Sequence, residues 1–315
     1  MDRNLALEFV RVTEAAAIAS ARWVGRGEKK KADGAAVDAM RQRFNLVDFK
    51  GTVVIGEGAK DEAPMLYTGE KVGTGRGPEM DLAIDPLECT DSVANGRYNA
   101  IAVIAAGPKD SLLHAPDTYM EKIAVGHKAR KAISLDASVR ENLKGVARAL
   151  DKKVSDLTVM VLDRDRHEKL IDDIRSAGAR VRLITDGDVS AAIATCFPES
   201  GVDVYMGIGG STEGVLAAVA LKVMGGEIIC RFKPRKDEDI PKIKAAGVAD
   251  LRRIFNSEDM AKGHELSFTA TGVIDGPLLS GVVFEKDKII THSVVTRGIS
   301  GTIRYITTHH HSYKW

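Results

Sequence analysis

The chain has 315 residues, of which 44% are hydrophobic and 28% charged, a composition that is ordinary for a globular protein and sufficient for a sizeable core. Lys and Arg number 45 against 44 for Asp and Glu, so the sequence lacks the basic excess that marks a nucleic-acid-binding domain. The length lies at the upper limit of one domain or indicates two fused halves.

The three cysteines, Cys89, Cys196 and Cys230, are widely spaced and form no CxxC pair. This spacing argues against a disulfide framework and a zinc knuckle, and it favours the reducing cytoplasm. The first apolar stretch carries acids, unlike a signal peptide, and no apolar run reaches the roughly 20 residues of a membrane span. We therefore expect a cytoplasmic protein without a membrane segment.

The first third of the chain predicts two helices and three strands. Apolar residues at three- and four-residue steps predict a helix over 2–25, and a second helix is predicted over about 34–46 with Asp33 as its N-cap. "GTVVIGEG" predicts a short buried strand that leads to Glu57. "DLAID" predicts a strand closed by Asp85 and followed by a sharp turn, and "AIAVIAAG" predicts another buried strand.

After about residue 112 strands and helices alternate. Helices predicted at 138–150, about 166–176, from Asp188 onward and at 211–224 are interleaved with the strands "LTVMVLD", "VRLITD" and "VDVYMGIG". The residues from 266 to 306 are mostly β-like. The alternation predicts an α/β fold in which a parallel or mixed sheet is covered by helices, with the boundary between halves somewhere from 110 to 150.

Acidic residues follow several of the predicted strands, namely Glu57, Asp85, Asp186 and Glu213. A single acid in such a place is usually a solvated turn residue. Because ligands of α/β sheets bind beyond the carboxyl ends of the strands, we expect these acids to gather, together with Asp33. Clustered carboxylates repel one another without a cation, and Mg²⁺ and Mn²⁺ prefer oxygen ligands. The pattern therefore predicts a divalent-metal site.

Two further stretches indicate anion binding. "GIGGSTEG", residues 207–214, runs from a strand into a helix, where free N–H groups favour an anion, although the spacing is neither that of a P-loop nor of a Rossmann fingerprint. In "LDRDRH", Arg164 and Arg166 are suited to clamp a phosphate, or they stand at an exposed helix start.

Hydroxyl-binding groups complete the pattern. Asp186 and Asp188 can accept hydrogen bonds from sugar hydroxyls, while Asp188 can instead cap a helix. Tyr119 is either a substrate contact or an ordinary core aromatic. Thr90 lies where a hydroxyl can orient an attacking water. A metal, phosphate-binding groups and hydroxyl-binding acids together favour hydrolysis of a sugar phosphate.

At this point the sequence resembles a known family. The motif strand-DPLExT with an upstream "GEG" and a downstream "GGSTEG" resembles the metal-dependent, lithium-sensitive sugar phosphatases. "KKADGAAVDAMR", "IGEGAKDEAPMLY", "DPLECT", "LDRDRH", "TDGDV" and "GIGGSTEGVLAA", in this order, resemble the class II fructose-1,6-bisphosphatases over about residues 3–306. The resemblance implies a layered αβαβα sugar-phosphatase fold and a homo-oligomer, dimer or tetramer. It also implies hydrolysis of the 1-phosphate of fructose 1,6-bisphosphate, in gluconeogenesis or, in a photosynthetic organism, the reductive pentose phosphate cycle.

The resemblance also implies roles for single positions. The metal ligands, for Mn²⁺ or Mg²⁺, are Asp33, Glu57, Asp85, Glu88 and Glu213. The catalytic residue is Thr90, with Lys29 and Asp61 as second candidates. The substrate-contacting positions are Glu88, Cys89, Thr90, Tyr119, Arg164, Asp165, Arg166, Asp186, Gly187, Asp188 and Gly210. Residues 1–130 are then the metal-binding and catalytic half, and residues 131–315 the substrate-binding half.

Cys89 departs from the family, which has glycine at this position. If the backbone there has a positive φ, any side chain costs about 1 kcal/mol or more. Cys89→Gly is therefore expected to keep or raise activity. A cysteine phosphatase with Cys89 as nucleophile is not favoured, because that class has arginine six residues further on, where this chain has Asn95.

Three alternatives stay open at this stage. The first is a dual fructose-1,6-/sedoheptulose-1,7-bisphosphatase, and the second is a relative that acts on inositol monophosphate. The third is a non-catalytic regulator that binds a sugar phosphate or nucleotide on the same scaffold. The terminal "TTHHHSYKW" is interpreted as a polar tail without a structural metal.

Overall fold

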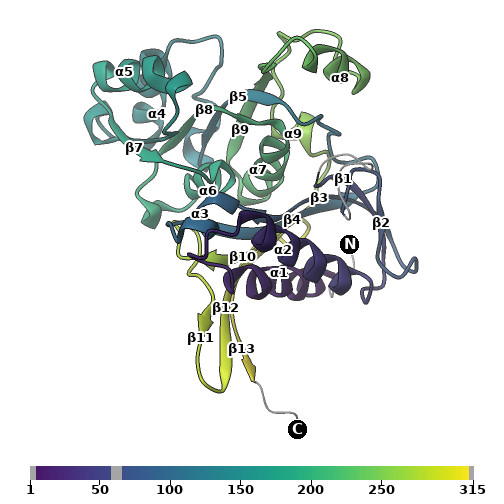
Figure 1. Cartoon of the computed structure of the whole chain (residues 1–315). Coiled ribbons are helices and arrows are strands. Elements are labelled where there is room, and N and C mark those ends of the chain that lie inside the picture. The colour runs from purple at the N-terminus through teal and green to yellow at the C-terminus, as the bar shows by residue number, and fades with distance from the viewer. Residues whose placement is uncertain (1–4, 58–65, 312–315) are drawn as a thin grey trace. The chain divides into compact units, whose positions relative to one another are not determined.

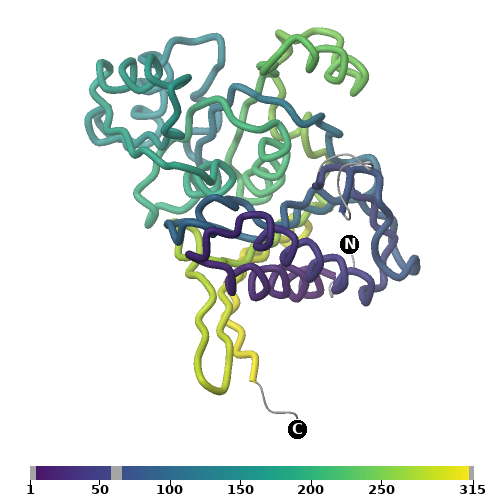
Figure 2. Tube along the Cα trace, in the orientation of Figure 1, coloured from purple at the N-terminus to yellow at the C-terminus, as the bar shows by residue number. Residues whose placement is uncertain are grey.

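The computed structural model describes residues 5–57 and 66–311. The chain divides into two compact units, which we call unit 1 (residues 1–112 and 263–315) and unit 2 (residues 113–262). Figure 2 shows the chain entering unit 2 in blue and returning to unit 1 in yellow-green. The expected boundary near residue 130 therefore falls inside unit 2, and residues 263–315, expected in the second half, belong to unit 1. The roles assigned to the two halves stay predictions.

Unit 1 is built on one mixed sheet. Its elements are α1 (Leu5–Ala21), α2 (Lys29–Phe44), β1 (Lys50–Ile55), β2 (Lys71–Val72), β3 (Glu79–Glu88), α3 (Thr90–Asn95), β4 (Ala100–Pro108), β10 (Ser267–Ile274), β11 (Val283–Phe284), β12 (Lys288–Arg297) and β13 (Thr302–His311). The strand order is β11-β12-β10-β4-β3-β1-β2, with β13 paired to β12. Strands β1 and β3 run parallel, whereas their neighbours pair antiparallel.

Helices α1 and α2 cover one face of this sheet (Figure 1). The apolar side of α1 places Phe9 against Phe44 of α2 and against Phe49, with ring centroids 6.2 and 5.4 Å away. The hydroxyls of Thr13 on α1 and Thr271 on β10 lie 2.7 Å apart, so segments from the two ends of the sequence share one core. These contacts explain why the predicted first helix forms, as Leu5–Ala21 within the expected range.

Unit 2 has its own mixed sheet, in the order β7-β6-β8-β5-β9. Its elements are β5 (Tyr119–Val125), η1 (His127–Ala129), α4 (Val139–Leu150), η2 (Val154–Asp156), β6 (Thr158–Leu162), η3 (Asp165–His167), α5 (Glu168–Ala177), β7 (Arg180–Ile184), α6 (Asp188–Ala194), η4 (Pro198–Ser200), β8 (Val204–Gly210), α7 (Ser211–Met224), β9 (Glu227–Phe232), α8 (Asp239–Ala245) and α9 (Ser257–Met260). Strand β6 pairs in parallel with β7 and β8, and β5 pairs antiparallel with β8 and β9.

The helices of unit 2 cover both faces of its sheet. Ile123 of β5 belongs to an apolar cluster with Val146 of α4 and Ile174 of α5. The alternate residue Lys122 faces the opposite way and contacts Asp188 at the start of α6. A two-residue period on β5 thus separates the two sides, as expected for a strand buried on both faces.

The fold-class prediction, α/β with mixed sheets covered by helices, is confirmed within each unit. The predicted helices at 138–150 and 211–224 are α4 and α7, and the β-rich tail is confirmed by β10 to β13. A capping box between Ser138 and Glu141 starts α4 where the sequence places it. In the described part of the chain, no helix is both long and apolar enough to cross a bilayer.

Candidate active site

The "DPLECT" segment leaves unit 1's sheet later than the sequence predicts. Strand β3 does not end at Asp85 but continues through Pro86 to Glu88. Its pairing with β4 shifts register between Asp85 and Glu88, so Pro86 sits in an irregularity where no regular ladder bond is required. Asp85 is half-buried and accepts a hydrogen bond from the N–H of Leu87 at 3.0 Å, and Glu88 is buried. Both carboxylates therefore belong to one strand end.

The sharp turn comes at Cys89, whose φ of 76° and ψ of 48° are left-handed. L-residues adopt this conformation reluctantly because Cβ crowds the carbonyl oxygen. The positive φ that makes a cysteine strained at this position is therefore present. Thr90 follows at once as the first residue of α3, and the half-buried Cys89 side chain packs against unit 1's core.

Glu57 and Asp85 lie just past the paired part of two neighbouring parallel strands, with Glu57 beyond the end of β1 and Asp85 still within β3. The pairing of β1 with β3 ends at Ile55 and Ala83, so each acid lies two residues past the last paired position of its strand. Glu57 is half-buried, like Asp85. Glu57 thus follows its strand as expected from the sequence, whereas Asp85 does not close β3, and the metal-binding role of both acids stays a prediction. Asp61, the second candidate for orienting water, lies outside the described residues.

The start of α2 lies beside α3. Lys29 donates to Asp91 with a 3.0 Å contact between Nζ and Oδ2, which joins the first residue of α2 to the second residue of α3. Asp33 stands one turn after Lys29, and burial raises the pKa of its carboxyl group while the Lys29 charge opposes the shift. The prediction that Asp33 caps its helix is wrong. The helix begins at Lys29 after Glu28, because favourable helix formers extend it by a turn.

The chemistry of these donors fits a hard divalent cation. All five implied ligands are carboxylates, the groups that Mg²⁺ and Mn²⁺ prefer. Burial disfavours the ionised forms of Asp33 in unit 1 and Glu213 in unit 2, a penalty that a bound cation relieves. Among the described residues, no three His, Cys, Asp or Glu side chains are already grouped closely enough to hold a metal.

In unit 2, parallel strands bring the other predicted segments to one edge of the sheet. Strands β6, β7 and β8 end at Leu162, Ile184 and Gly210, and β6 pairs in parallel with the other two. The segments that follow them are 164–166, 186–188 and 211–213. This is the edge at which α/β sheets bind ligands, as the sequence analysis assumes.

Tyr119, Gly210 and Arg166 meet at this edge. Tyr119 on β5 is the direct strand partner of Gly210 on β8. The guanidinium carbon of Arg166 lies 4.7 Å from the centre of the Tyr119 ring. Arg166 donates from Nε and Nη2 to the carbonyl oxygen of Ile208 at 3.1 and 2.8 Å, which holds the guanidinium in place. Tyr119 is therefore not an ordinary core aromatic but half-buried beneath a fixed cation.

The segments 164–166 and 186–188 are also joined. Arg164 donates to Asp186 at 2.7 Å between Nη2 and Oδ1. Gly187 has a φ of 92°, a left-handed value that suits glycine, and it precedes α6, so Asp188 is the first residue of that helix and not its cap. Asp165 is exposed at the start of the 3₁₀ turn η3.

Gly210 leaves room for the carboxylate of Glu213. A Cβ at Gly210 would overlap that carboxylate, which folds back over the start of α7. The hydroxyl of Thr212 donates to Oε2 of Glu213 at 2.7 Å. Burial, then the negative charge of Asp188, raises the pKa of Glu213, and the positive charge of Lys122 opposes the shift. The repulsion expected between clustered carboxylates is thus present within unit 2.

The comparisons identify the family. The model of the bacterial fructose-1,6-bisphosphatases, glpX-encoded, matches residues 3–310. The chain belongs to this family. "Fructose-1,6-bisphosphatase 1 class 2" of Escherichia coli (strain K12) is 45% identical over 324 residues, which cover 99% of this chain and 96% of that protein. "Fructose-1,6-bisphosphatase class 2" of Shigella flexneri shows the same values.

One solved structure is also similar in part. It is an extragenic suppressor from Pyrococcus furiosus, with 12% identity, a TM-score of 0.32, and coverage of 60% of this chain and 69% of that chain. We draw no conclusion about the fold or function of this chain from so low a TM-score. As a member of the bacterial fructose-1,6-bisphosphatase family, the chain is a phosphoric monoester hydrolase, and its reaction is the hydrolysis of fructose 1,6-bisphosphate.

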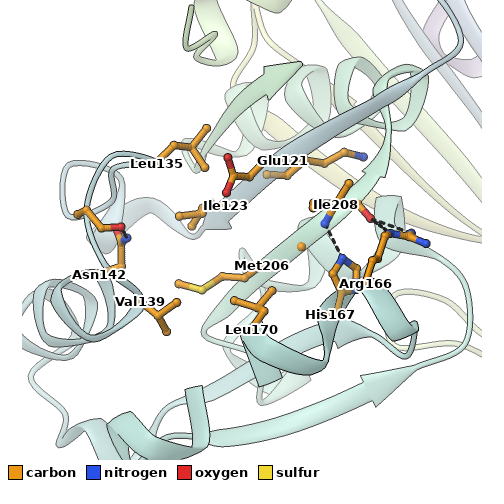
Figure 3. A pocket seen from close by; sticks show the side chains of 13 residues that line it. Glu121, Ile123, Leu135, Val139, Asn142, Arg166, His167, Leu170, Met206 and Ile208 are labelled. Carbon is orange, nitrogen blue, oxygen red and sulfur yellow. Dashed lines mark hydrogen bonds between the residues drawn. The ribbon is translucent and has the colours of Figure 1, made fainter. Parts of the chain in front are cut away.

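In this bisphosphatase a cavity of about 140 Å³ opens beside Arg166 on the face of unit 2's sheet that carries α4 and α5 (Figure 3). Its walls are mainly apolar, with Ile123, Met206 and Leu170 among them. The buried His167 ring accepts from the N–H of Ile208 at 2.7 Å through Nε2, and Nδ1 lies 2.7 Å from the carbonyl oxygen of Leu162. This ring ties η3 to β8 behind Arg166.

Two charged residues that contact the predicted site residues of this bisphosphatase were not predicted from the sequence. Arg235 lies in the strongly charged segment "KPRKDEDIPKIK", and its guanidinium is 5.1 Å from the Tyr119 ring centre. Lys122 is buried beside Asp188. The signal for Lys122 was a lysine within the otherwise apolar strand "MEKIAV", but no local pattern in the sequence joins Arg235 to Tyr119.

Proposed function

We propose that the chain removes the 1-phosphate of fructose 1,6-bisphosphate with the help of Mg²⁺ or Mn²⁺, as a step of gluconeogenesis. The observation that carries this proposal is the parallel register of β1 and β3. It sends Glu57 and Asp85 out at one edge, while β3 itself continues to Glu88 and the turn before Thr90. Metal-dependent hydrolysis of a phosphate ester uses oxygen ligands for the cation and can use a hydroxyl to orient the attacking water.

The metal-binding role is proposed for Asp33, Glu57, Asp85 and Glu88 of unit 1 and for Glu213 of unit 2. A divalent cation bound by such carboxylates polarises the phosphoryl group and lowers the pKa of a bound water. The chain's own contribution is to supply these acids, of which Asp33 and Glu213 ionise more readily when a cation offsets the effect of burial, and to present the Thr90 hydroxyl, which orients a water or relays its proton. Lys29, fixed by Asp91 at 3.0 Å, adds positive charge at the start of α2.

The second phosphate is proposed to bind in unit 2. Arg166 is held by the carbonyl oxygen of Ile208 and stacks over Tyr119, so its guanidinium is positioned before a ligand arrives. Arg164 is fixed in the same way by Asp186, and Arg235 adds a third guanidinium near Tyr119. Guanidinium groups match phosphate oxygens in charge and geometry. Asp186 and Asp188 are proposed to accept hydrogen bonds from the sugar hydroxyls.

Phosphate release tests the proposal. The purified protein, stripped with EDTA, is expected to lose activity and to regain it with Mn²⁺ or Mg²⁺. Alkylation of thiols is expected to leave most of the activity. Fructose 1,6-bisphosphate, sedoheptulose 1,7-bisphosphate and inositol monophosphate are compared as substrates, and analysis of the sugar product shows which phosphate leaves. Full activity in EDTA, or release of the 6-phosphate, would contradict the proposal.

A cytoplasmic homo-oligomer is also proposed. None of the three cysteines is in a disulfide, which fits a reducing compartment. Among the described residues, the ten-residue strand β13 pairs with β12 alone, and Ile303 on it is exposed. A long edge strand with apolar side chains is suited to pair with another chain. Light scattering is expected to give a dimer or tetramer, and Ile303→Lys is expected to weaken this assembly, whereas Leu46→Lys, at an exposed position in the turn after α2, serves as the control.

A further inference from the structure

A buried ion pair lies between β5 and α6 in unit 2. Lys122 is 2% exposed and Asp188 is 7% exposed. The ammonium donates to the carboxylate with 2.7 Å between Nζ and Oδ2. The fully buried Tyr205 on β8 donates its hydroxyl to the same oxygen at 3.3 Å. Two donors from two strands therefore converge on Oδ2 of Asp188.

Two further titratable groups lie beside this ion pair. Glu213 on α7 and Cys230 on β9 face the pair. The charges of Asp188 and Glu213 raise the pKa of Lys122 against the opposing effect of burial, so its ammonium is charged. The lysine therefore balances carboxylates on two helices.

Gly209 of "GIGGSTEG" makes room for the buried pair of Lys122 and Asp188. A Cβ at Gly209 would overlap Oδ2 of Asp188 and lie 3.3 Å from Nζ of Lys122. A Cβ at Gly214 would lie 3.7 Å from Cε of Lys122, an ordinary van der Waals contact, so Gly209 is the glycine that the pair requires. The motif interpreted from sequence as an anion site thus also accommodates a buried cation and its partner.

Stability alone gives little reason for such a pair, because removing two charges from water is expensive and apolar residues of similar volume often serve a core as well or better. The geometry suits another purpose. While Oδ2 of Asp188 receives both donors, Oδ1 accepts no hydrogen bond from the described residues. A carboxylate fixed through one oxygen presents the other in a defined direction.

We propose that Lys122, assisted by Tyr205, is a positioning residue that fixes one oxygen of Asp188 so that the other accepts a hydrogen bond from a sugar hydroxyl of the bisphosphate. This inference rests on the proposed contact between Asp188 and the sugar. Lys122 itself does not touch the substrate. It sets the orientation of the acid that does, before the substrate arrives, and so reduces the ordering required on binding.

The test compares the kinetics of three variants. Lys122→Met keeps length and volume but removes the donor, and it is expected to raise KM for fructose 1,6-bisphosphate about 10-fold with kcat changed by less than about threefold, because the lost interaction is a binding one. Asp188→Asn is expected to raise KM at least as much. In Lys122→Met/Asp188→Asn, KM is expected to equal that of Asp188→Asn, because the lysine acts through the acid.

A matched control separates positioning from folding. Lys152→Met removes another ammonium from a nearly buried carboxylate, that of Asp203, 2.5 Å away. It is expected to lower the urea midpoint and to leave KM unchanged. If Lys122→Met does not fold, Tyr205→Phe, which removes the weaker donor, is expected to raise KM about threefold at an unchanged kcat.

The outcomes distinguish this inference from the proposal on which it rests. An unchanged KM in Asp188→Asn would refute the contact between Asp188 and the sugar. A raised KM in Asp188→Asn with an unchanged KM in Lys122→Met would refute the positioning role and leave the contact standing. Effects of Lys122→Met and Asp188→Asn that multiply in the double variant would also overturn it, as would a fall in kcat alone.

Discussion

Replacing Cys89 by glycine tests the link between backbone conformation and activity most directly. The cysteine holds φ at 76° and ψ at 48°, immediately before Thr90. Glycine reaches this region without strain, whereas an L-residue is about 1–2 kcal/mol less favourable there. The substitution therefore relieves strain at the turn that carries the proposed catalytic hydroxyl.

Two opposing effects reduce the gain in stability. Glycine adds freedom to the unfolded chain, which costs about 0.4–1 kcal/mol. The half-buried thiomethyl group also packs against unit 1's core, and losing it costs part of the ~0.8 kcal/mol of a buried methylene. The three contributions nearly cancel, so the free energy of unfolding is expected to change by less than about 1 kcal/mol. Activity, by contrast, is expected to stay equal or to rise by up to about 30-fold, since ~2 kcal/mol of strain is the most that relief can return.

The assay is phosphate release by a series at position 89. Cys89→Ala removes the thiol and keeps Cβ, and Cys89→Val adds β-branching, which suits a positive φ least. The expected order of kcat is glycine at or above cysteine and alanine, with valine lowest. A large loss of kcat in Cys89→Gly would refute the reasoning, and equal losses in Cys89→Gly and Cys89→Ala would instead indicate a role for the thiol.

Three further predictions concern unit 2. Arg166→Met is expected to raise KM for fructose 1,6-bisphosphate about 10- to 100-fold, because a charged hydrogen bond contributes roughly 1.5–3 kcal/mol. Arg182→Met, which replaces an exposed arginine, is expected to leave KM unchanged. If Arg166→Met raised KM equally for a fructose monophosphate that lacks the second phosphate, this prediction would be contradicted. Gly210→Ala is expected to lower activity strongly, because the added Cβ overlaps the Glu213 carboxylate. Normal phosphate release by this variant would show that the carboxylate can move without loss of activity. Burial lowers the pKa of His167, so the unfolded state binds its proton more readily and the free energy of unfolding falls as pH drops below about 6.5. Urea unfolding at pH 5.5 and 7.5 is expected to show a smaller difference in this free energy for His167→Asn than for the parent.

Local sequence patterns predicted much of the fold. The 3.6-residue period of α1 and the capping box of α4 are local signals, and both helices form where these signals place them. The predicted strand end was wrong because pairing with a neighbouring strand overrode the local sequence pattern. The sequence predicts that the strand closes at Asp85, yet pairing with β4 carries β3 on to Glu88 through a register shift.

The same difference between local patterns and long-range contacts applies to the predicted site residues. That Glu57, Asp85 and Glu213 come just after apolar runs can be read locally, although Asp85 lies within β3 and not beyond its end. That Arg166 stacks on Tyr119 cannot, because the two are brought together only by the pairing of β5 with β8 and by the bond from Arg166 to Ile208.

The sequence by itself determined the class of chemistry, because the identity of donors along the chain sets which ions and phosphates it can bind. It also determined the strands and helices whose periodicity is local. Only the tertiary structure decided that Cys89 is left-handed, that Lys122 is a buried partner of Asp188, and that residues 263–315 complete unit 1. Backbone angles at a turn, burial of a charge and strand pairing all depend on residues distant in sequence, and no single local pattern contains them.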